Sequence, residues 1–197
     1  MSFDSSAMPW VRMPTVHGEF SARVFSVQGE EHLVLQRGDV ANTPGVLVRI
    51  HSECLTGDAL FSRRCDCGPQ LARSLELLGQ ARAGVLVYVR GQEGRGIGLR
   101  AKLAAYALQD QGLDTVDANL HLGLPVDARS YDGVVEILTT LGVRQLRLLT
   151  NNPDKIRQLE QPPLEIVERV ALQVAVDEEH RAYLETKRQR LGHWLDL

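Results

Sequence analysis

The chain has 197 residues, a formal net charge of −3 and 44% apolar residues. The slight acidic balance argues against a protein that binds duplex nucleic acid, which needs a basic excess on one face, but it leaves room for a local basic pocket. The apolar content is too high for a disordered chain, and three cysteines are too few for a disulfide scaffold. Aromatic residues make up only 5%, so a core of Leu, Val and Ala is expected, which favours an α/β or mixed α+β protein.

The N-terminal residues contain neither a secretory signal nor a membrane span. Charged residues such as Asp4, Arg12 and Glu19 interrupt every apolar run there, and no stretch in the chain reaches the roughly 20 apolar residues of a transmembrane helix. We therefore expect a cytoplasmic protein with no membrane partner, in which thiols stay reduced. Residues 1–12 are polar and rich in Ser, and we expect them to form a loose terminus.

Short strands are predicted over residues 20–27, 33–36 and 46–50, with turns at Gly29 and Pro44 between them. Each run is rich in apolar and β-branched residues, and each is bounded by turn-forming residues. This stretch is therefore expected to supply the first part of a sheet.

A loop over residues 51–67 leads to a predicted helix that Gly84 ends. The apolar residues of this helix recur at helical spacing: Leu71, Leu75, Leu78. The apolar run 85–90 is typical of a buried strand, and the glycine-rich segment 92–98 connects it to a second helix that starts at Leu99.

The remaining chain continues the alternation of helix and strand. The predicted elements are a third helix through Val134, Leu138 and Leu141, a strand over 145–149, a loop over 150–154, a short helix opened by Lys155, a late strand region over 164–176 and a C-terminal helix over 178–191. This alternation predicts a mixed β-sheet with helices on both faces. The chain has no internal repeat and no linker long enough to divide it, so we expect a single domain over residues 13–197.

The three cysteines indicate a metal site. Cys54, Cys65 and Cys67 lie close together beside charged residues and Gly68, which suits metal ligands better than core thiols. Three thiolates favour zinc, because an iron–sulfur cluster normally needs four. His51 would complete a structural site, whereas water would complete a catalytic one, and zinc-activated water points to hydrolysis.

A zinc-dependent nucleobase deaminase is one alternative that this cluster raises. Such enzymes carry His-x-Glu followed by Pro-Cys-x-x-Cys. The chain contains His51-Ser52-Glu53, but its later pair, Cys65-Asp66-Cys67, is one residue too tight and has no preceding Pro. The spacing therefore disfavours a deaminase.

The glycine-rich segment Gln92–Leu99 is a candidate phosphate site. Glycines let the backbone approach an anion, amide groups at a helix start favour it, and Arg95 can add a bidentate contact. The segment matches neither the dinucleotide-binding nor the Walker pattern, and a plain turn would use the same glycines. Arg49, Arg129 and Lys155 lie near predicted strand ends or loops and are further candidate anion contacts, although each alone also fits a solvated surface charge.

Six segments share their residues and their order with one enzyme family. They are Arg49–Asp58, Cys65–Leu71, Glu93–Leu99, Asp114–Asn119, Leu149–Pro153 and Tyr183–Lys187. Together they resemble GTP cyclohydrolase II of riboflavin biosynthesis, over about Gly18 to Gly192. Two departures from the pattern are an extra residue at Gly91 and a shortened connection at Gln161–Pro163.

The resemblance implies that the chain converts GTP to 2,5-diamino-6-ribosylamino-4(3H)-pyrimidinone 5′-phosphate, formate and pyrophosphate. It further implies that Cys54, Cys65 and Cys67 hold one Zn²⁺, that a zinc-activated water attacks C8 of the guanine, and that Mg²⁺ serves the triphosphate. A homodimer is implied as well. The dihydroxybutanone-phosphate synthase that is often fused N-terminally is expected to be absent, because the segment before Gly18 is too short for a domain.

The resemblance also implies roles for single residues. It maps Asp127 to a general base, Arg129 to a nucleophile at the α-phosphate and Tyr106 to a proton donor near the reacting ring. A guanidinium is normally protonated, so Arg129 can equally stabilise the phosphoryl transition state electrostatically, and Tyr106 can equally be a core ring. The implied substrate contacts are Arg49, Ile50, His51, Ser52, Glu53, Gln70, Glu93, Gly94, Arg95, Thr115, Thr150 and Lys155.

Two other functions remain open from the sequence. A non-catalytic nucleotide-binding zinc protein is disfavoured, because Asp127, Arg129 and Tyr106 are all present. A related enzyme could open the ring and retain the formamide. Product analysis with a separate formate assay distinguishes these possibilities.

Overall fold

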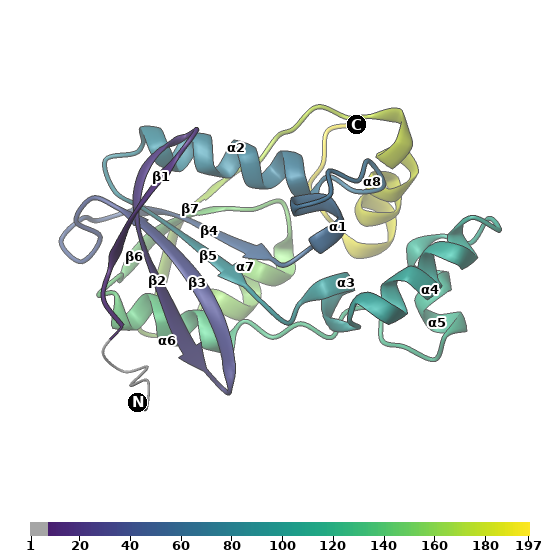
Figure 1. Ribbon diagram of the computed structural model, residues 1–197, viewed down its shortest axis with the longest axis horizontal. Coiled ribbons are helices and arrows are strands. Elements are labelled where there is room, and N and C mark those ends of the chain that lie inside the picture. Colours follow the sequence, from purple (N-terminus) through teal and green to yellow (C-terminus); the bar gives the residue numbers. More distant parts are fainter. Residues whose placement is uncertain (1–7) are drawn as a thin grey trace.

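The computed structural model describes residues 8–197, which form one mixed sheet of seven strands with eight helices around it (Figure 1). The strands are β1 (Val11–Thr15), β2 (Gly18–Val27), β3 (Glu30–Arg37), β4 (Val46–Ser52), β5 (Gly84–Val89), β6 (Gln145–Leu149) and β7 (Glu165–Val170). The helices are α1 (Leu55–Asp58), α2 (Cys67–Gln80), α3 (Glu93–Gly96), α4 (Leu99–Gln109), α5 (Thr115–His121), α6 (Asp132–Thr140), α7 (Pro153–Leu159) and α8 (Glu178–Leu191).

The strand order is β1-β2-β3-β5-β4-β6-β7. Neighbours from β1 to β5 pair antiparallel, and β5, β4, β6 and β7 run parallel to one another. Helices connect the parallel strands, as such crossovers require. The carboxyl ends of β4, β5 and β6 therefore meet at one edge, where open α/β sheets bind ligands.

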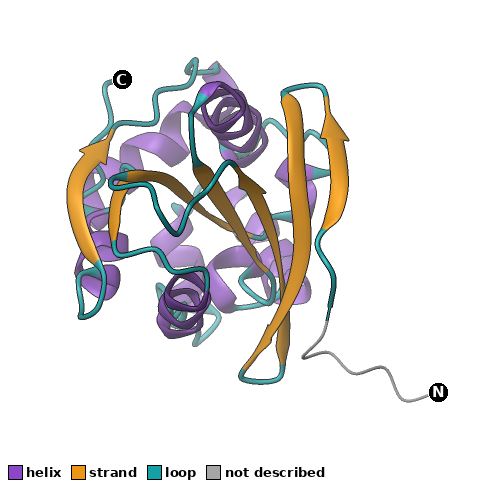
Figure 2. Cartoon of the chain, turned by 90° about the vertical axis from the view of Figure 1, so that its left-hand side faces the viewer, coloured by secondary structure: helices purple, strands orange, loops and turns teal. Residues whose placement is uncertain are grey.

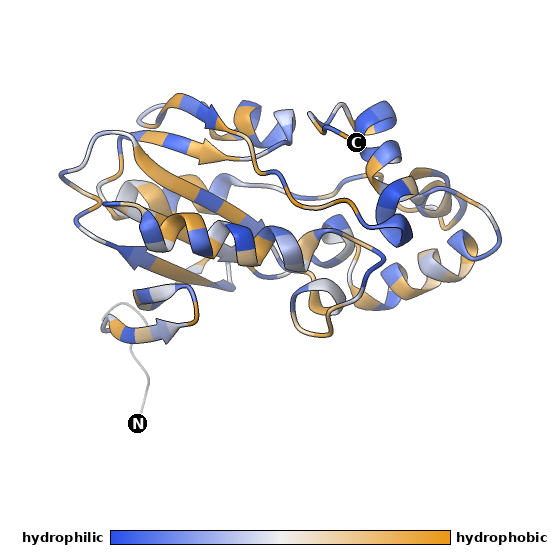
Figure 3. Cartoon of the chain, turned by 90° about the horizontal axis from the view of Figure 1, so that it is seen from above, coloured by the Kyte–Doolittle hydropathy of each residue, from blue (hydrophilic) through white to orange (hydrophobic). Residues whose placement is uncertain are grey.

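Two apolar clusters cover the two faces of the sheet. Leu78 of α2 packs with Leu35 and Leu86 on one face, and Ile137 of α6 packs with Val48 and other residues on the opposite face. Figure 2 shows helices on both sides of the strands, and Figure 3 shows apolar residues concentrated along the central strands. The mixed sheet with helices on both faces that the sequence predicts is confirmed.

The ends of the chain differ from the sequence prediction in two places. Of the expected loose terminus, residues 1–7 lie outside the described part, but Val11 and Arg12 belong to β1 and pair with β2. The late strand region ends at Val170, because residues 171–177 carry no regular structure before Asp177 caps α8.

Gly84 begins β5 and does not end the preceding helix, which stops at Gln80. A Cβ at position 84 would lie 2.6 Å from Leu78 Cδ2 and 3.4 Å from the Leu47 carbonyl oxygen. Glycine is therefore used here for close packing between strand and helix. The short helices α1 and α5 were not predicted either; in α5 the side chain of Asp114 accepts hydrogen bonds from the backbone of Val116 and Asp117.

Within residues 8–197, every helix falls short of the length and apolar character that crossing a bilayer demands.

Candidate active site

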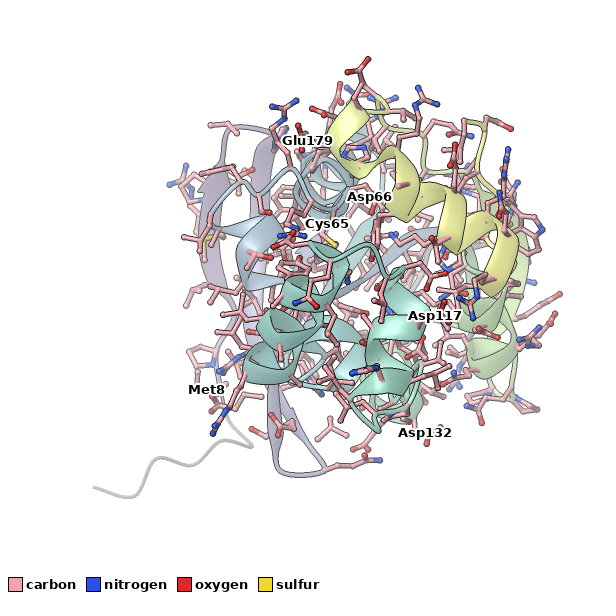
Figure 4. All side chains as sticks on the ribbon, turned by 90° about the vertical axis from the view of Figure 1, so that its right-hand side faces the viewer. Met8, Cys65, Asp66, Asp117, Asp132 and Glu179 are labelled. Atoms are coloured by element: carbon pink, nitrogen blue, oxygen red, sulfur yellow. The ribbon has the colours of Figure 1, made fainter. Side chains whose placement is uncertain are left out.

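A pocket lies at the carboxyl ends of the parallel strands. Residues of β4 form one wall, the starts of α1 and α2 carry the cysteines, and α4, α5 and α8 supply the far wall. Figure 4 looks toward this end of the molecule and shows Cys65 and Asp66 beside α8. Most of the residues expected to form the site line this pocket: Arg49, His51, Ser52, Glu53, Cys54, Cys65, Cys67, Gln70, Gly94, Arg95, Tyr106, Thr115, Arg129, Thr150 and Lys155.

The three cysteines form a compact sulfur cluster. Their sulfurs lie within 4.8 Å of one another, and the sulfurs of Cys54 and Cys65 are 3.7 Å apart. Zinc–sulfur bonds of about 2.3 Å in a tetrahedron would separate two sulfurs by about 3.8 Å. A Cβ at Gly57 would lie 2.8 Å from Cys65 Sγ, so the backbone at Gly57 packs directly against the sulfurs and leaves no room for a side chain. The donor set and its spacing fit a metal ion of the zinc type.

The electrostatic state of the cluster supports the same conclusion. The pKa of the Cys54 thiol is lowered, chiefly by hydrogen bonds from the Cys65 and Cys67 thiols and further by the charge of Lys102. In return, Cys54 raises the pKa of Cys65 to about 11 and raises that of Cys67. Ionisation of all three thiols therefore requires a cation between them.

His51 does not join the sulfur cluster. Its Nε2 lies 2.9 Å from Asp58 Oδ1, and Tyr88 donates a hydrogen bond to Asp58 Oδ2 at 2.8 Å. Burial lowers the pKa of His51 despite its hydrogen bond to Asp58. Among the described residues, only the three cysteines group as donors, and the ring nitrogens of His51 face Asp58 and Arg49 instead. The geometry therefore favours water over His51 at the fourth position.

A buried chain of hydrogen bonds runs from β4 toward α8. Arg49 Nη2 donates to Gln70 Oε1 at 2.8 Å, and Gln70 Nε2 donates to Asp66 Oδ2 at 2.5 Å. The ammonium of Lys187 lies 2.7 Å from Asp66 Oδ1. Burial lowers the pKa of Arg49 to about 10, so this guanidinium remains a cation at neutral pH.

The glycine-rich segment forms a tight, irregular turn between β5 and α4. Gly94 and Arg95 both have left-handed backbone angles, with φ of 60° and 63°. Glu93 accepts from the amide of Leu55 at 2.7 Å and from Lys102 at 2.5 Å. Arg95 lines the pocket, and its Nη2 has no hydrogen-bond partner among residues 8–197. A half-buried arginine whose Nη2 atom is buried without a partner is suited to an anion.

Arg129 is held in place by an ion pair. Its Nε and Nη2 lie 2.9 and 2.5 Å from the two carboxylate oxygens of Asp127, and its Nη1 donates to Ser52 Oγ at 3.3 Å. Burial alone would lower the pKa of Arg129, but the bonds to Asp127 offset this and the pKa is raised. The guanidinium is thus a fixed cation facing the pocket.

Tyr106 lies in the pocket wall with a cation on its ring. Arg64 Cζ is 4.4 Å from the ring centroid, and Arg64 also pairs with Asp110 at 2.6 Å. Burial raises the pKa of Tyr106, although the nearby Lys102 charge lowers it in part. The phenol therefore keeps its proton at neutral pH and can donate it.

Three of the expected site residues do not line the pocket. Ile50 is fully buried in the core, although its carbonyl accepts from Lys155 Nζ at 2.8 Å. Glu93 and Asp127 are engaged with Lys102 and Arg129. These three residues are placed to hold other site residues.

Several other residues of the pocket are not among those expected from the sequence. They are Arg64, Lys102, Asn119, Asn151, Asn152, Tyr183, Lys187 and His193. Lys102 lies in the first turn of α4, directly after the glycine-rich segment, and a basic residue at that place could have indicated a cation of the pocket. Tyr183 and Lys187 belong to a segment that carried the family resemblance, but nothing local assigned them a role. The extra Gly91 sits in a turn, where its amide donates to Glu53 Oε2 at 2.8 Å.

The pocket is strongly cationic although the chain is acidic. Among the described residues that line it, Arg49, Arg64, Arg95, Lys102, Arg129, Lys155 and Lys187 are basic and Glu53 is the only acid. The pKa of Lys155 is lowered, mainly by burial and also by the nearby charges of Arg49 and Arg129. Such a pocket suits a polyanionic ligand.

Comparison with known proteins identifies the family. A model of the GTP cyclohydrolase II family matches residues 7–171. The riboflavin biosynthesis protein RibBA of Chlamydia trachomatis is 48% identical over 188 residues, which cover 94% of this chain and 44% of that protein. RibBA of Nocardia farcinica is 55% identical over 184 residues and that of Mycobacterium tuberculosis 56% over 188, each covering 92% of this chain and 44% of that protein.

The chain spans less than half the length of these curated relatives. A solved structure of RibBX, a two-domain 3,4-dihydroxy-2-butanone 4-phosphate synthase from A. baumannii, has a TM-score of 0.42 at 20% identity over 85% of this chain and 39% of that one. That likeness is too distant to carry an argument. The family model covers most of the chain and agrees with the relatives, so the chain belongs to the GTP cyclohydrolase II family.

Proposed function

We propose that the chain hydrolyses GTP to 2,5-diamino-6-ribosylamino-4(3H)-pyrimidinone 5′-phosphate, formate and pyrophosphate, in riboflavin biosynthesis. The observation that carries this proposal is one pocket in which a three-sulfur cluster faces seven basic side chains. The sulfurs suit a hydrolytic metal ion, and the cations suit a triphosphate. The proposed catalytic domain covers residues 13–197.

Zn²⁺ is the proposed ion at Cys54, Cys65 and Cys67, because soft thiolates in a tetrahedral arrangement select it. When bound, it supplies Lewis-acid activation of water for attack at C8 of the guanine ring. Tyr106 would donate a proton to the opening ring, because its phenol lines the pocket and burial, which raises its pKa, is opposed by the nearby Lys102 charge.

Arg49 and Gln70 are proposed to contact the guanine, together with three residues that line the same wall: His51, Ser52 and Glu53. They lie beside the sulfur cluster in the pocket wall, whereas Ile50 holds Lys155 through its carbonyl. Buried polar groups of this kind reject the wrong purine strongly, because an unmatched base would leave them without partners.

The triphosphate is proposed to lie against Gly94, Arg95 and Lys155, with Thr115 and Thr150 as further contacts. Mg²⁺ is the proposed second ion. It binds mainly through phosphate oxygens and needs few protein carboxylates, which agrees with Glu53 as the single acid among the described lining residues.

Arg129 is proposed to stabilise the charge at the α-phosphate electrostatically. Its bonds to Asp127 and its raised pKa favour a permanent cation over a nucleophile. Asp127 then holds Arg129, and the ion pair lowers the pKa of Asp127 although burial opposes this. A role for Asp127 as a general base would require that pair to open.

Parallel assays of formate, pyrophosphate and the nucleotide product by mass test the proposal. GTP with Mg²⁺ should yield all three in the wild-type protein. Cys65→Ser should lose bound zinc and formate release together, with an unchanged far-ultraviolet spectrum as the control. Product that retains the formyl group would point instead to an enzyme that stops after ring opening, and absence of all products to a non-catalytic nucleotide-binding protein.

The cytoplasm is the proposed location, since a reducing compartment keeps the three free thiols available for a metal. The proposed assembly is a homodimer.

A further inference from the structure

Asp66 stands at the residue before α2, where an Asp side chain usually accepts hydrogen bonds from the helix backbone. Here the Asp66 side chain makes no such bond. Its carboxylate instead accepts from Gln70 Nε2 at 2.5 Å and from Lys187 Nζ at 2.7 Å. The carboxylate is 1% exposed. This buried anion therefore bonds two side chains and does not cap the helix.

The chemistry of Asp66 determines how Gln70 is oriented. A carboxylate only accepts hydrogen bonds, so Gln70 must turn its amide nitrogen toward Asp66. Its carbonyl oxygen then faces the other way and accepts from Arg49 Nη2 at 2.8 Å. Asp66 thus selects one of the two amide orientations of Gln70 and places an acceptor against the Arg49 guanidinium.

Lys187 makes the buried charge of Asp66 tolerable. A buried carboxylate is costly unless it is paired, and the Lys187 ammonium, 2.7 Å from Asp66 Oδ1, supplies that pair. Lys187 is 121 residues away along the chain, on α8. The same ammonium lies 4.3 Å from the ring centroid of Tyr183, one turn earlier on α8. The C-terminal helix therefore contacts the segment that contains Cys65 and Cys67 through this ion pair, in addition to the pair between Arg63 and Asp177 at the helix start. Figure 4 shows Asp66 beside α8.

We propose that Asp66 and Lys187 are positioning residues of the active site. Lys187 holds Asp66, Asp66 orients Gln70, and Gln70 orients Arg49. The Asp66 carboxylate also anchors the backbone between Cys65 and Cys67. The C-terminal helix is then a part of the site that sets the affinity for guanine and for the metal ion. This inference rests on the proposed function for its guanine half and on the sulfur cluster alone for its metal half.

The principal variant is Asp66→Asn, since Asn has nearly the same shape as Asp and the Asp66 side chain makes no capping bond that the change could remove. Lys187 and Gln70 bond different oxygens of Asp66, and in Asn one of these two positions becomes an NH2 group, which cannot accept from the donor that it faces. We expect the Kd for the α,β-methylene analogue of GTP and the KM for GTP to rise about 10-fold or more, as for a lost charge-assisted hydrogen bond. The kcat should change less than the KM.

Further variants separate positioning from general stability. The losses of affinity from Asp66→Asn and Gln70→Ala should be less than additive in the double variant, because both changes break the same chain of contacts. Lys187→Met should resemble Asp66→Asn, whereas Lys187→Arg should restore most of the affinity. Arg188→Gln, an exposed neighbour on α8, is the matched control and should behave as the wild type.

Retention of zinc against a chelator gives a readout that needs no GTP. Asp66→Asn and Lys187→Met should lose zinc sooner than Arg188→Gln. Wild-type affinities and zinc retention in Asp66→Asn, or independent losses from Asp66→Asn and Gln70→Ala, would overturn the inference. Failure of the wild-type protein itself to turn over GTP would count against the proposed function, and the chelator series would still test the metal half. If Asp66→Asn does not fold, the comparison of Lys187→Met with Lys187→Arg decides.

Discussion

Lys102 shows how one buried side chain serves two parts of the site. Its ammonium lies 3.2 Å from Cys54 Sγ, 2.7 Å from Thr56 Oγ1 and 2.5 Å from Glu93 Oε1. Glu93 in turn holds the amide of Leu55 at 2.7 Å. Burial would lower the pKa of Lys102, but its bonds to Glu93 and Cys54 raise it. The cation therefore balances thiolate charge and ties the glycine-rich turn to α1.

Lys102→Met should weaken zinc binding about 10- to 100-fold, as other outer partners of metal ligands do. The substitution keeps the length of the side chain and removes the charge beside Cys54. Competition with a chromogenic chelator measures the affinity. Arg100→Met, at an exposed position of the same helix, serves as the control, and equal zinc affinity in both variants would contradict the role of Lys102.

Substitutions of Arg129 separate its two candidate roles, electrostatic stabilisation and nucleophilic attack at the α-phosphate. Arg129→Ala should lower the rate of pyrophosphate release about 10²- to 10³-fold, the usual effect of removing one preorganised electrostatic group. Arg129→Lys keeps the charge and should recover part of that rate, whereas a true nucleophile would tolerate neither change. Zinc content should stay at the wild-type level in both variants. Normal pyrophosphate release by Arg129→Ala would remove Arg129 from the phosphate chemistry.

At the level of elements, the short helix α1 is shaped by the sulfur cluster that it partly surrounds. Its backbone carries Gly57, where an added Cβ would lie 2.8 Å from Cys65 Sγ, 3.0 Å from Cys67 Cβ and 3.2 Å from Cys54 Sγ. Contacts of less than 3.0 Å force a shift of the atoms involved. Glycine at this position is therefore part of the metal site, although it supplies no ligand.

Gly57→Ala should lower the zinc content of the purified protein, because the extra methyl group pushes Cys65 Sγ away from its partners. Elemental analysis measures this directly. Gly133→Ala is a suitable control, since the added Cβ at this position of α6 meets Val27 Cγ1 at 3.2 Å and no sulfur. Full zinc in Gly57→Ala would mean that the cluster accommodates a side chain there.

On the scale of the whole molecule, the segment after α8 returns to the pocket. The amide of Trp194 donates to the Asn151 carbonyl at 3.0 Å, and Arg169 Cζ lies 4.9 Å from the Trp194 ring centroid. His193 lines the pocket near three cations: Lys187 of α8, Lys155 of α7 and Arg129 in the segment before α6. The chain end thereby packs against the carboxyl edge of β6 and β7.

This arrangement predicts a pH dependence of stability. Burial lowers the pKa of His193 to about 3, and the charges of Lys187, Arg129 and Lys155 act in the same direction while Asp66 opposes them. The unfolded chain binds this proton near pH 6.5. Between these two pKa values only the unfolded state is protonated, so the stabilisation is present above about pH 6.5 and is lost as the pH falls toward 3.

His193→Gln should therefore reduce the fall in melting temperature between pH 7.5 and pH 5, measured by calorimetry. His51 also has a pKa lowered by burial, so part of the dependence should remain. His121→Gln, at an exposed position of α5, provides the comparison. A slope in His193→Gln equal to that of the wild type would show that His193 is protonated in the folded state as readily as in the unfolded one.

The expected homodimer is a prediction about assembly. The loop between α1 and α2 exposes Leu60 at 67% and Phe61 at 82%, and apolar side chains this exposed are suited to a partner surface. Static light scattering should give a mass of twice 21.9 kDa, and Phe61→Asp should shift the protein toward the monomer. A monomeric wild-type protein at micromolar concentration would contradict the dimer, and an unchanged mass for Phe61→Asp would place the interface elsewhere.

The sequence by itself determined the strand and helix alternation, the cysteine cluster and the family resemblance. Those signals are local: periodicity, spacing and short motifs lie within a few residues of each other. It did not indicate that Gly84 packs a strand on a helix, that His51 is taken by Asp58, or that Ile50 points into the core. Gly84 meets Leu47 of another strand, and Ile50 packs among residues from distant strands and helices. His51 meets Asp58 only seven residues later, but through the turn into α1 and not through a helical or strand spacing.

Only the tertiary structure decided which charges meet. Asp66 and Lys187 are 121 residues apart and Lys102 and Cys54 are 48 apart, and no local pattern relates either pair. The residues of each pair meet because the parallel strands place α1, α2, α4 and α8 at one edge of the sheet, beyond the carboxyl ends of the strands. Burial at that edge then makes each charge depend on its partner, because an unpaired buried ion is too costly to keep.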